Sequence, residues 1–221
     1  MAVNDRKTQL AVVGGGPAGY GAAFMAADLG LDLVLIDPEE NPGGICLYRG
    51  CIPSKALLHV ARVINEADES SSFGVTFAKP KVNLNKLRSW KNDVVDRLTG
   101  GLGQLVKQRK FRHLRATATF KDNHTLNIRE LGGAEYSLAF ETAIVATGSH
   151  PTKLGKLQPD SPLILDSTSA LDLEDVPPTL LVIGGGYIGL ELGTVYAALG
   201  SKVTVVEMTS GLLPGVDRDL V

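Results

Sequence analysis

Short apolar runs and one helical stretch alternate in the first part of the chain. Residues 10–13 are apolar and end in a glycine turn, and residues 20–29 read as a small-residue helix closed by Gly30. A second apolar run over residues 31–36 ends at Asp37. Strand, glycine turn, helix and strand in this order predict a unit with parallel strands.

The middle of the chain changes from a helical to a strand pattern. Pro53 fits the first turn of a helix over residues 54–63. Leucine and valine recur at helical spacing over residues 84–108, where glycines at 100, 101 and 103 predict a break or a close contact. Residues 111–140 read as strands, with turns at 122–123 and 132–133, and residues 143–146 as a separate buried strand.

A second unit repeats the first about 170 residues later. An apolar run over residues 180–183 leads into a glycine turn, a helix ending at Leu199, a Gly200 cap and a strand over residues 202–206 that ends at Glu207. Fourteen residues follow Glu207. A parallel sheet is normally covered on both faces, so we expect this second unit to be truncated.

Both turns have the spacing G-x-G-x-x-G. In such a loop the first glycine allows the tight turn, the second lets a pyrophosphate approach, and the third packs helix against strand. The acids Asp37 and Glu207 each lie 21 residues after the middle glycine of their loop. A carboxylate there accepts hydrogen bonds from ribose hydroxyls and repels a 2′-phosphate, so Glu207 favours NAD over NADP.

Composition and charge narrow the class of protein. The chain is 44% hydrophobic with net charge −2, and no run of 18 apolar residues or signal peptide is present, so we expect a soluble cytoplasmic protein. Residues 79–130 carry thirteen Lys/Arg against four Asp/Glu. A solvated helix and sheet explain this excess better than a nucleic-acid surface, because the aromatics that stack on bases are not interleaved.

The only two cysteines, Cys46 and Cys51, follow the first glycine loop, with four residues between them. In a cytoplasmic protein a lone pair next to a nucleotide unit favours a redox-active disulfide. A structural disulfide is the weaker alternative. A metal site is weaker still, since zinc needs four ligands and no histidine is nearby.

The run from Gly43 to Lys55 (GGICLYRGCIPSK) resembles the redox signature of the pyridine nucleotide-disulfide oxidoreductases. Within that family its Cys-Ile-Pro-Ser-Lys-Ala-Leu-Leu continuation is similar to the dihydrolipoamide dehydrogenases, in the form that serves bacterial pyruvate dehydrogenase complexes. The resemblance extends over the whole chain and includes residues 90–103, 146–149 and 165–168.

The resemblance implies an α/β fold of two parts. Residues 1–150 would form an FAD-binding Rossmann-like domain with an inserted helix and antiparallel strands, without its returning C-terminal segment. Residues 151–221 would begin an NAD-binding Rossmann-like domain. The implied reaction passes electrons from protein-bound dihydrolipoamide through a Cys46–Cys51 disulfide and FAD to NAD+. The implied partners are the dihydrolipoyl domains of a 2-oxoacid dehydrogenase complex and, in the full-length enzyme, a second subunit.

The resemblance also implies residue roles. Cys51 would lie against the flavin and Cys46 would exchange with the substrate, while Lys55 would lie near the flavin and pair with Glu191. A helix N-terminus and Lys55 would lower the thiol pKa. The expected FAD contacts are Gly14, Gly16, Pro17, Ala18, Gly19, Asp37, Pro38, Gly44, Lys55, Ala118, Thr147 and Gly148, and the expected NAD contacts are Gly184, Gly186, Tyr187, Ile188 and Glu207.

Three positions depart from the family pattern. Asp37 stands where glutamate is usual, and Leu47-Tyr48-Arg49 replaces the common Leu-Asn-Val between the cysteines. Tyr187 stands where some members have a tyrosine gate over the flavin, although a helix-packing role is as reasonable.

The family's histidine–glutamate acid/base pair has no counterpart in these residues, and none of the histidines at 59, 113, 124 and 150 is assigned that work. Two alternatives to the lipoamide enzyme therefore stay open. One is a catalytically inactive nucleotide-binding fragment. The other is a related enzyme that reduces glutathione, mercuric ion or another disulfide.

Overall fold

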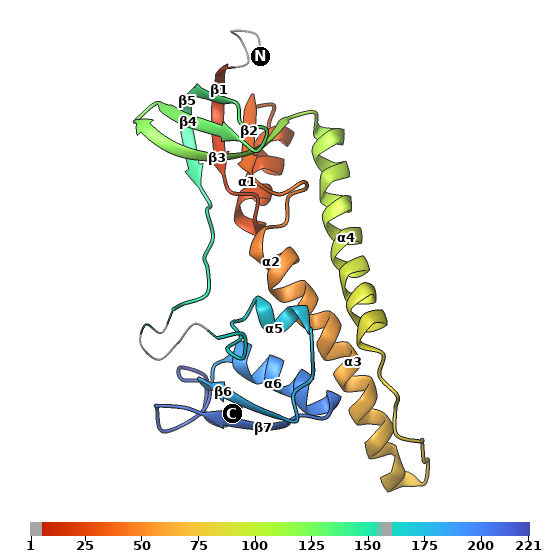
Figure 1. The fold of residues 1–221 in the computed structure, drawn as a ribbon. Coiled ribbons are helices and arrows are strands. Elements are labelled where there is room, and N and C mark those ends of the chain that lie inside the picture. Colours follow the sequence, from red (N-terminus) through yellow and green to blue (C-terminus); the bar gives the residue numbers. More distant parts are fainter. Residues whose placement is uncertain (1–5, 154, 156–160) are drawn as a thin grey trace. The chain divides into compact units, whose positions relative to one another are not determined.

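The computed structural model describes residues 6–153, 155 and 161–221 (Figure 1). Over these residues the chain divides into two compact units. The first unit comprises Met1–Tyr48 and Val95–His150, and the second comprises Arg49–Val94 and Pro151–Val221. Residues 49–94, which the sequence grouped with the first nucleotide unit, thus pack with the second.

The first unit is built on a parallel layer. β1 (Lys7–Val13) lies between β2 (Leu33–Asp37) and the end of β5 (Glu135–Val145), and β2 also pairs with the start of β3 (Arg112–Asp122). Helix α1 (Pro17–Asp28) connects β1 to β2. The predicted strand–turn–helix–strand unit is confirmed, with α1 beginning three residues earlier than expected.

An antiparallel meander closes the same sheet into a ring. β4 (Thr125–Glu130) pairs with the far halves of β3 and β5, so these two long strands belong to both layers (Figure 1). The strand predicted over residues 143–146 is present over 143–145, but it is the end of β5 rather than another strand, and Val145 is exposed rather than buried. A core between the layers consists of Ala11, Val13, Val34, Ile36, Ala116, Leu126, Ile128, Leu138 and Phe140.

One long helix, α4 (Leu84–Arg109), runs from the second unit into the first without a break. The glycines were expected to interrupt it or to permit a close contact, and the close contact is what the structure shows. A Cβ on Gly103 would overlap the side-chain oxygen of Asn41, whereas nothing lies within 4 Å of such an atom on Gly100 or Gly101. Gly103 therefore allows the loop that carries Asn41 to pack closely against α4.

The second unit consists of a small β–α–β element and the helices that pack with it. β6 (Thr179–Ile183) and β7 (Lys202–Val206) pair in parallel and are connected by α6 (Tyr187–Leu199), as predicted. Helix α3 begins at Cys51 and continues to Glu69, longer than expected at both ends. η2 (Ser70–Phe73) follows it, and α5 (Ser169–Asp172) precedes β6. The shared core consists of Leu57, Ala61, Ala170, Leu171, Leu173, Leu192, Val195 and Tyr196.

Several arginines of the basic segment are paired within the first unit. Arg109 contacts Asp28 at 2.9 Å, and Arg129 contacts Glu135 at 2.7 Å. In the part of the chain that the structure describes, no helix is both long and apolar enough to cross a membrane.

Candidate functional site

The first glycine loop is a tight backbone cradle at the carboxyl ends of β1 and β2. Gly14 has φ +105° and donates its N–H to the Ile36 carbonyl at 2.8 Å. A Cβ on Gly14 would overlap the Ala146 carbonyl, and one on Gly19 would overlap the Gly14 carbonyl. Only glycine fits at these two positions, as the spacing predicted.

The carboxylate of Asp37 braces this cradle from behind. Gly15 N–H donates to Oδ2 at 2.5 Å and Glu39 N–H donates to Oδ1 at 2.9 Å. The side chain is 7% exposed. Each carboxylate oxygen has a further lone pair that can accept a hydrogen bond. Asp37 can therefore contact a ribose, as predicted, without losing its two bonds to the loop.

The second glycine loop repeats this construction in the other unit. Gly184 has φ +102°, and its N–H donates to the Val206 carbonyl at 2.8 Å. Glu207 accepts from Gly185 N–H at 2.7 Å and from Thr209 N–H at 2.8 Å. The hydrogen bond from Thr209 N–H, and after it the one from Gly185 N–H, lower the pKa of Glu207 to about 2, so the carboxylate is charged at neutral pH.

The helix behind each loop presents backbone N–H groups. Both α1 and α6 start after a glycine, Gly16 and Gly186, and neither helix has a side-chain cap. Pro17 supplies no N–H, and it sits at the first helical position, where none is required. Uncapped donors and the positive end of the helix dipole form a site for phosphate oxygens. The exposed Ala18, Tyr187 and Ile188 lie at these ends.

The cysteine segment begins directly on the first loop. Gly43 N–H donates to the Gly15 carbonyl at 2.7 Å. Gly44, at φ +58°, packs so closely on Gly16 that a Cβ would overlap its Cα. Gly44 starts the short helix α2 (Gly44–Arg49), which carries Cys46. The helix that carries Cys46 is thereby attached to the glycine loop of its own unit.

The two cysteines differ in environment. Cys46 is half-buried, Cys51 is exposed as the first residue of α3, and no disulfide joins them in the structure. Burial is the main cause that raises the pKa of Tyr20, and the electrostatic interaction with Cys46 raises it further. Cys51 is the more exposed of the two, so exposure alone does not identify Cys46 as the thiol that exchanges with a substrate.

Lys55 and Glu191 form the ion pair that the resemblance implied. The Lys55 Nζ donates to Glu191 Oε1 at 2.5 Å, joining α3 to α6 within the second unit. The lysine side chain is 58% exposed and the glutamate side chain 29%, so solvent screens the attraction between them. The pair is confirmed, and its role beside a flavin remains a prediction.

The remaining expected contacts lie in or just after strands of the first unit. Pro38 is exposed after Asp37, and Ala118 is half-buried opposite Ile128 in the meander. Thr147 and Gly148 are exposed just beyond β5, with Gly148 at φ +72°. Among the described residues, no three histidine, cysteine or acidic side chains gather in a way that could hold a metal ion.

Known proteins share this arrangement. The sequence profile of the pyridine nucleotide-disulphide oxidoreductases matches residues 8–221. The chain belongs to that family. It is 50% identical to a dihydrolipoyl dehydrogenase of Haemophilus influenzae over 97% of its own length, and 48% identical to dihydrolipoyl dehydrogenase 2 of Haloarcula marismortui over 96%. It covers 45% of each of these relatives, about half of their length.

A solved structure gives the same result. The HOCl-induced flavoprotein disulfide reductase RclA from Escherichia coli superimposes with a TM-score of 0.78 at 30% identity, over 96% of this chain and 44% of that one. The fold and the family relationship to flavoprotein disulfide reductases are therefore established for the residues compared.

Residues that support the cysteine segment were missed by the sequence reasoning. Tyr48 was noted only as a departure from the family, yet its hydroxyl donates to the Asn41 carbonyl at 3.0 Å. Thr99, 2% exposed, was seen only as part of a helical pattern. The only sequence signal for this cluster was a tyrosine four residues after the Gly43-Gly44 pair. The contacts between segments far apart in the chain left no signal in the sequence.

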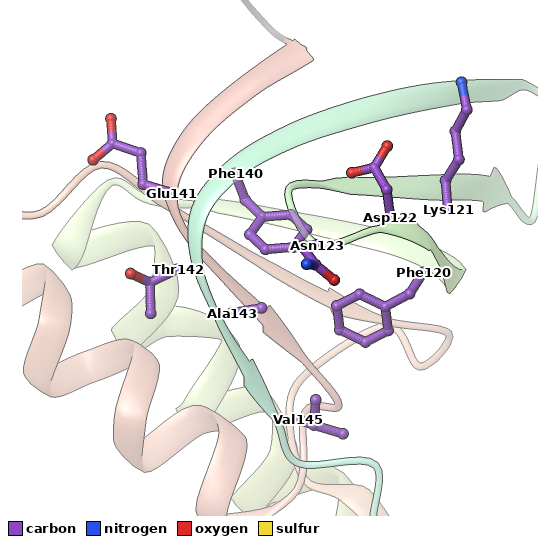
Figure 2. Close-up of a pocket in the computed structure, with 9 residues that line it drawn as sticks. All are labelled: Phe120, Lys121, Asp122, Asn123, Phe140, Glu141, Thr142, Ala143 and Val145. Atoms are coloured by element: carbon purple, nitrogen blue, oxygen red, sulfur yellow. The ribbon is translucent and has the colours of Figure 1, made fainter.

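A cavity of about 530 Å3 contains none of the predicted site residues (Figure 2). It lies between the β3–β4 turn and β5, where the rings of Phe120 and Phe140 meet edge to face at 5.9 Å. Along β5, residues 141–145 pair with β1 on one side and with no described strand on the other. The cavity follows this unpaired edge.

Proposed function

We propose that the chain is the nucleotide- and thiol-bearing part of an NAD-dependent dihydrolipoamide dehydrogenase. The attachment of α2 to the first glycine loop carries this proposal, because it couples Cys46 to the cradle that would hold FAD. The loop before α1 would bind the FAD pyrophosphate, and the loop before α6 would bind that of NAD. When bound, these cofactors supply the two-electron carriers.

The protein's own chemistry is thiol–disulfide exchange. A thiolate of dihydrolipoamide attacks Sγ of Cys46, which breaks the Cys46–Cys51 bond and releases the Cys51 thiolate. The second substrate thiolate then attacks the substrate sulfur of the mixed disulfide, forming the lipoamide ring and releasing Cys46. Two electrons enter the cysteine pair, two protons leave the substrate, and the reduced pair passes the electrons onward.

The roles of the two thiols are tested by their spectra in FAD-loaded protein. A thiolate against the flavin should give a long-wavelength charge-transfer band after reduction. Cys51→Ser should abolish this band, and Cys46→Ser should retain it. The same variants should separate exchange: with oxidised lipoamide, the Cys46 thiolate of Cys51→Ser should open the ring disulfide to give a mixed disulfide and a free lipoyl thiol, and Cys51 in Cys46→Ser should not. If neither substitution altered the band or the formation of the mixed disulfide, the dithiol role would be wrong.

Two narrower alternatives follow from the comparisons. The likeness to RclA supports a reductase for a different disulfide, and it predicts that glutathione or another disulfide exchanges faster than lipoamide. Coverage of 45% of the curated relatives supports a second candidate, in which this chain alone binds nucleotide without turnover. A 221-residue protein that oxidises dihydrolipoamide at the rate of the longer relatives would exclude it.

A further inference from the structure

Helix α2 is too short to be stable by itself. It has six residues, Gly44–Arg49, and isolated helices shorter than about 12 residues are marginal in water. Its position, and that of Cys46, must therefore come from packing. The start of the helix rests on the glycine loop, and Leu47, 7% exposed, is buried.

Tyr48 anchors the other end of α2. Its hydroxyl donates to the Asn41 carbonyl at 3.0 Å and is within hydrogen-bond reach of the Thr99 hydroxyl. Its ring packs on Gly43, where a Cβ would come to 3.0 Å from Cε2. Tyr48 thus ties the helix that carries Cys46 back to the segment preceding it.

The groups that hold Tyr48 are themselves fixed. Thr99 donates to the Val95 carbonyl within α4 at 3.0 Å, and the side chain of Asn41 lies against Gly103 of the same helix. Burial, and then the charges of Glu39 and Asp37, raise the pKa of Tyr48 against the opposing hydrogen bonds. The phenol therefore keeps its proton at neutral pH and remains a donor.

We propose that Tyr48 is a positioning residue that sets the reduction potential of the cysteine pair by fixing Cys46, two positions before it. The proposal rests on the proposed function, in which Cys46 and Cys51 form a redox-active disulfide. A disulfide is favoured when its two thiols are held within reach, and it loses stability when one of them gains freedom. The phenol hydroxyl restricts that freedom.

The test is an equilibrium of the purified chain with glutathione. One oxidised glutathione accepts two electrons from the two thiols, the Cys46–Cys51 bond forms, and two reduced glutathiones leave with the two protons. Alkylation of the remaining thiols and mass measurement give the equilibrium constant. Tyr48→Phe removes only the hydroxyl, and it should weaken the disulfide about tenfold, equivalent to about 30 mV for this two-electron couple.

A matched control lies in the same unit. Tyr136 also uses its hydroxyl, donating to Glu130 Oε1 at 2.9 Å in the meander, so Tyr136→Phe should leave the potential unchanged. Gly103→Ala should displace Asn41 and weaken the disulfide in the same direction as Tyr48→Phe. Circular dichroism confirms that each variant is folded before its potential is compared.

The outcomes separate the two proposals. A wild-type pair that glutathione never oxidises overturns the redox function, and the role of Tyr48 with it. A wild-type pair that oxidises normally, with a folded Tyr48→Phe protein within about twofold of it, overturns only the positioning role. If Gly103→Ala shifts the potential and Tyr48→Phe does not, the loop matters and the hydroxyl does not.

Discussion

Asp37 and Glu207 both support the glycine loop of their own unit. Asp37 ends β2 and Glu207 directly follows β7, and each accepts the N–H of the residue between the first two glycines of the motif, Gly15 or Gly185. The carboxylates therefore hold the cradle in shape before any nucleotide arrives. A substitution at either acid changes the loop as well as the charge that a ribose or 2′-phosphate meets.

Cofactor preference is predicted at Glu207. Glu207→Ala should weaken NAD binding by roughly tenfold and ease NADP binding, because the charged acceptor for the ribose hydroxyls and the repulsion of a 2′-phosphate are both lost. Dissociation constants for both cofactors measure the change. Glu207→Gln is the matched control, since its amide oxygen can still accept from Gly185. Equal affinity of the unmodified protein for both cofactors would contradict the prediction.

At the scale of elements, the four-residue helix α5 depends on its neighbours. Its carbonyls at Ala170 and Leu171 accept from the Tyr196 hydroxyl of α6 at 3.0 Å and from Lys91 Nζ of α4 at 2.8 Å. Lys91 is 6% exposed, and burial is the main cause that lowers its pKa. Lys91 therefore ties α4 to α5, and Tyr196 ties α5 to α6.

Lys91→Met should lower the free energy of unfolding by about 1–3 kcal/mol, because the aliphatic stem is kept while the Leu171 carbonyl loses its donor. Urea unfolding followed by circular dichroism measures the loss. Lys86→Met, at an exposed lysine of the same helix, should change stability by less than about 0.5 kcal/mol. Equal effects of the two substitutions would show that the buried hydrogen bond contributes nothing.

At the scale of the whole chain, two glycine loops of matching geometry lie in two compact units. The family is established, and the chain spans about half the length of its curated relatives. The sheet of the first unit leaves residues 141–145 without a strand on one side among the described residues. Val145 is 61% exposed and Phe120 51% exposed beside that edge, so apolar side chains accompany unpaired backbone groups.

We predict that the 221-residue chain associates through this edge, since exposed strand edges pair with other chains. Sedimentation velocity should show a mass that rises with concentration. Val145→Lys should reduce the association, because a charge on an edge opposes pairing. Met25→Lys is the matched control, as Met25 is 63% exposed and belongs to α1 rather than to β5 or the β3–β4 turn. A wild-type chain that stays monomeric at all concentrations would contradict the prediction.

The sequence alone determined the features that depend on local spacing. The two β–α–β units and the long helix follow from hydrophobic periodicity and from glycines at positions whose backbone geometry only glycine accepts. The cysteine motif follows from a specific redox signature. The Lys55–Glu191 pair came from the resemblance to a family. These signals are contained within one segment or in a motif.

Only the tertiary structure decided which distant segments meet. It merged residues 143–145 into β5, because β1 supplies the partner for that run, and it grouped residues 49–94 with the second unit. It also brought Asn41, Tyr48, Thr99 and Gly103 together around the helix of Cys46. The contacts of Asn41 and Tyr48 with α4 join positions more than 50 residues apart, and no local periodicity encodes them.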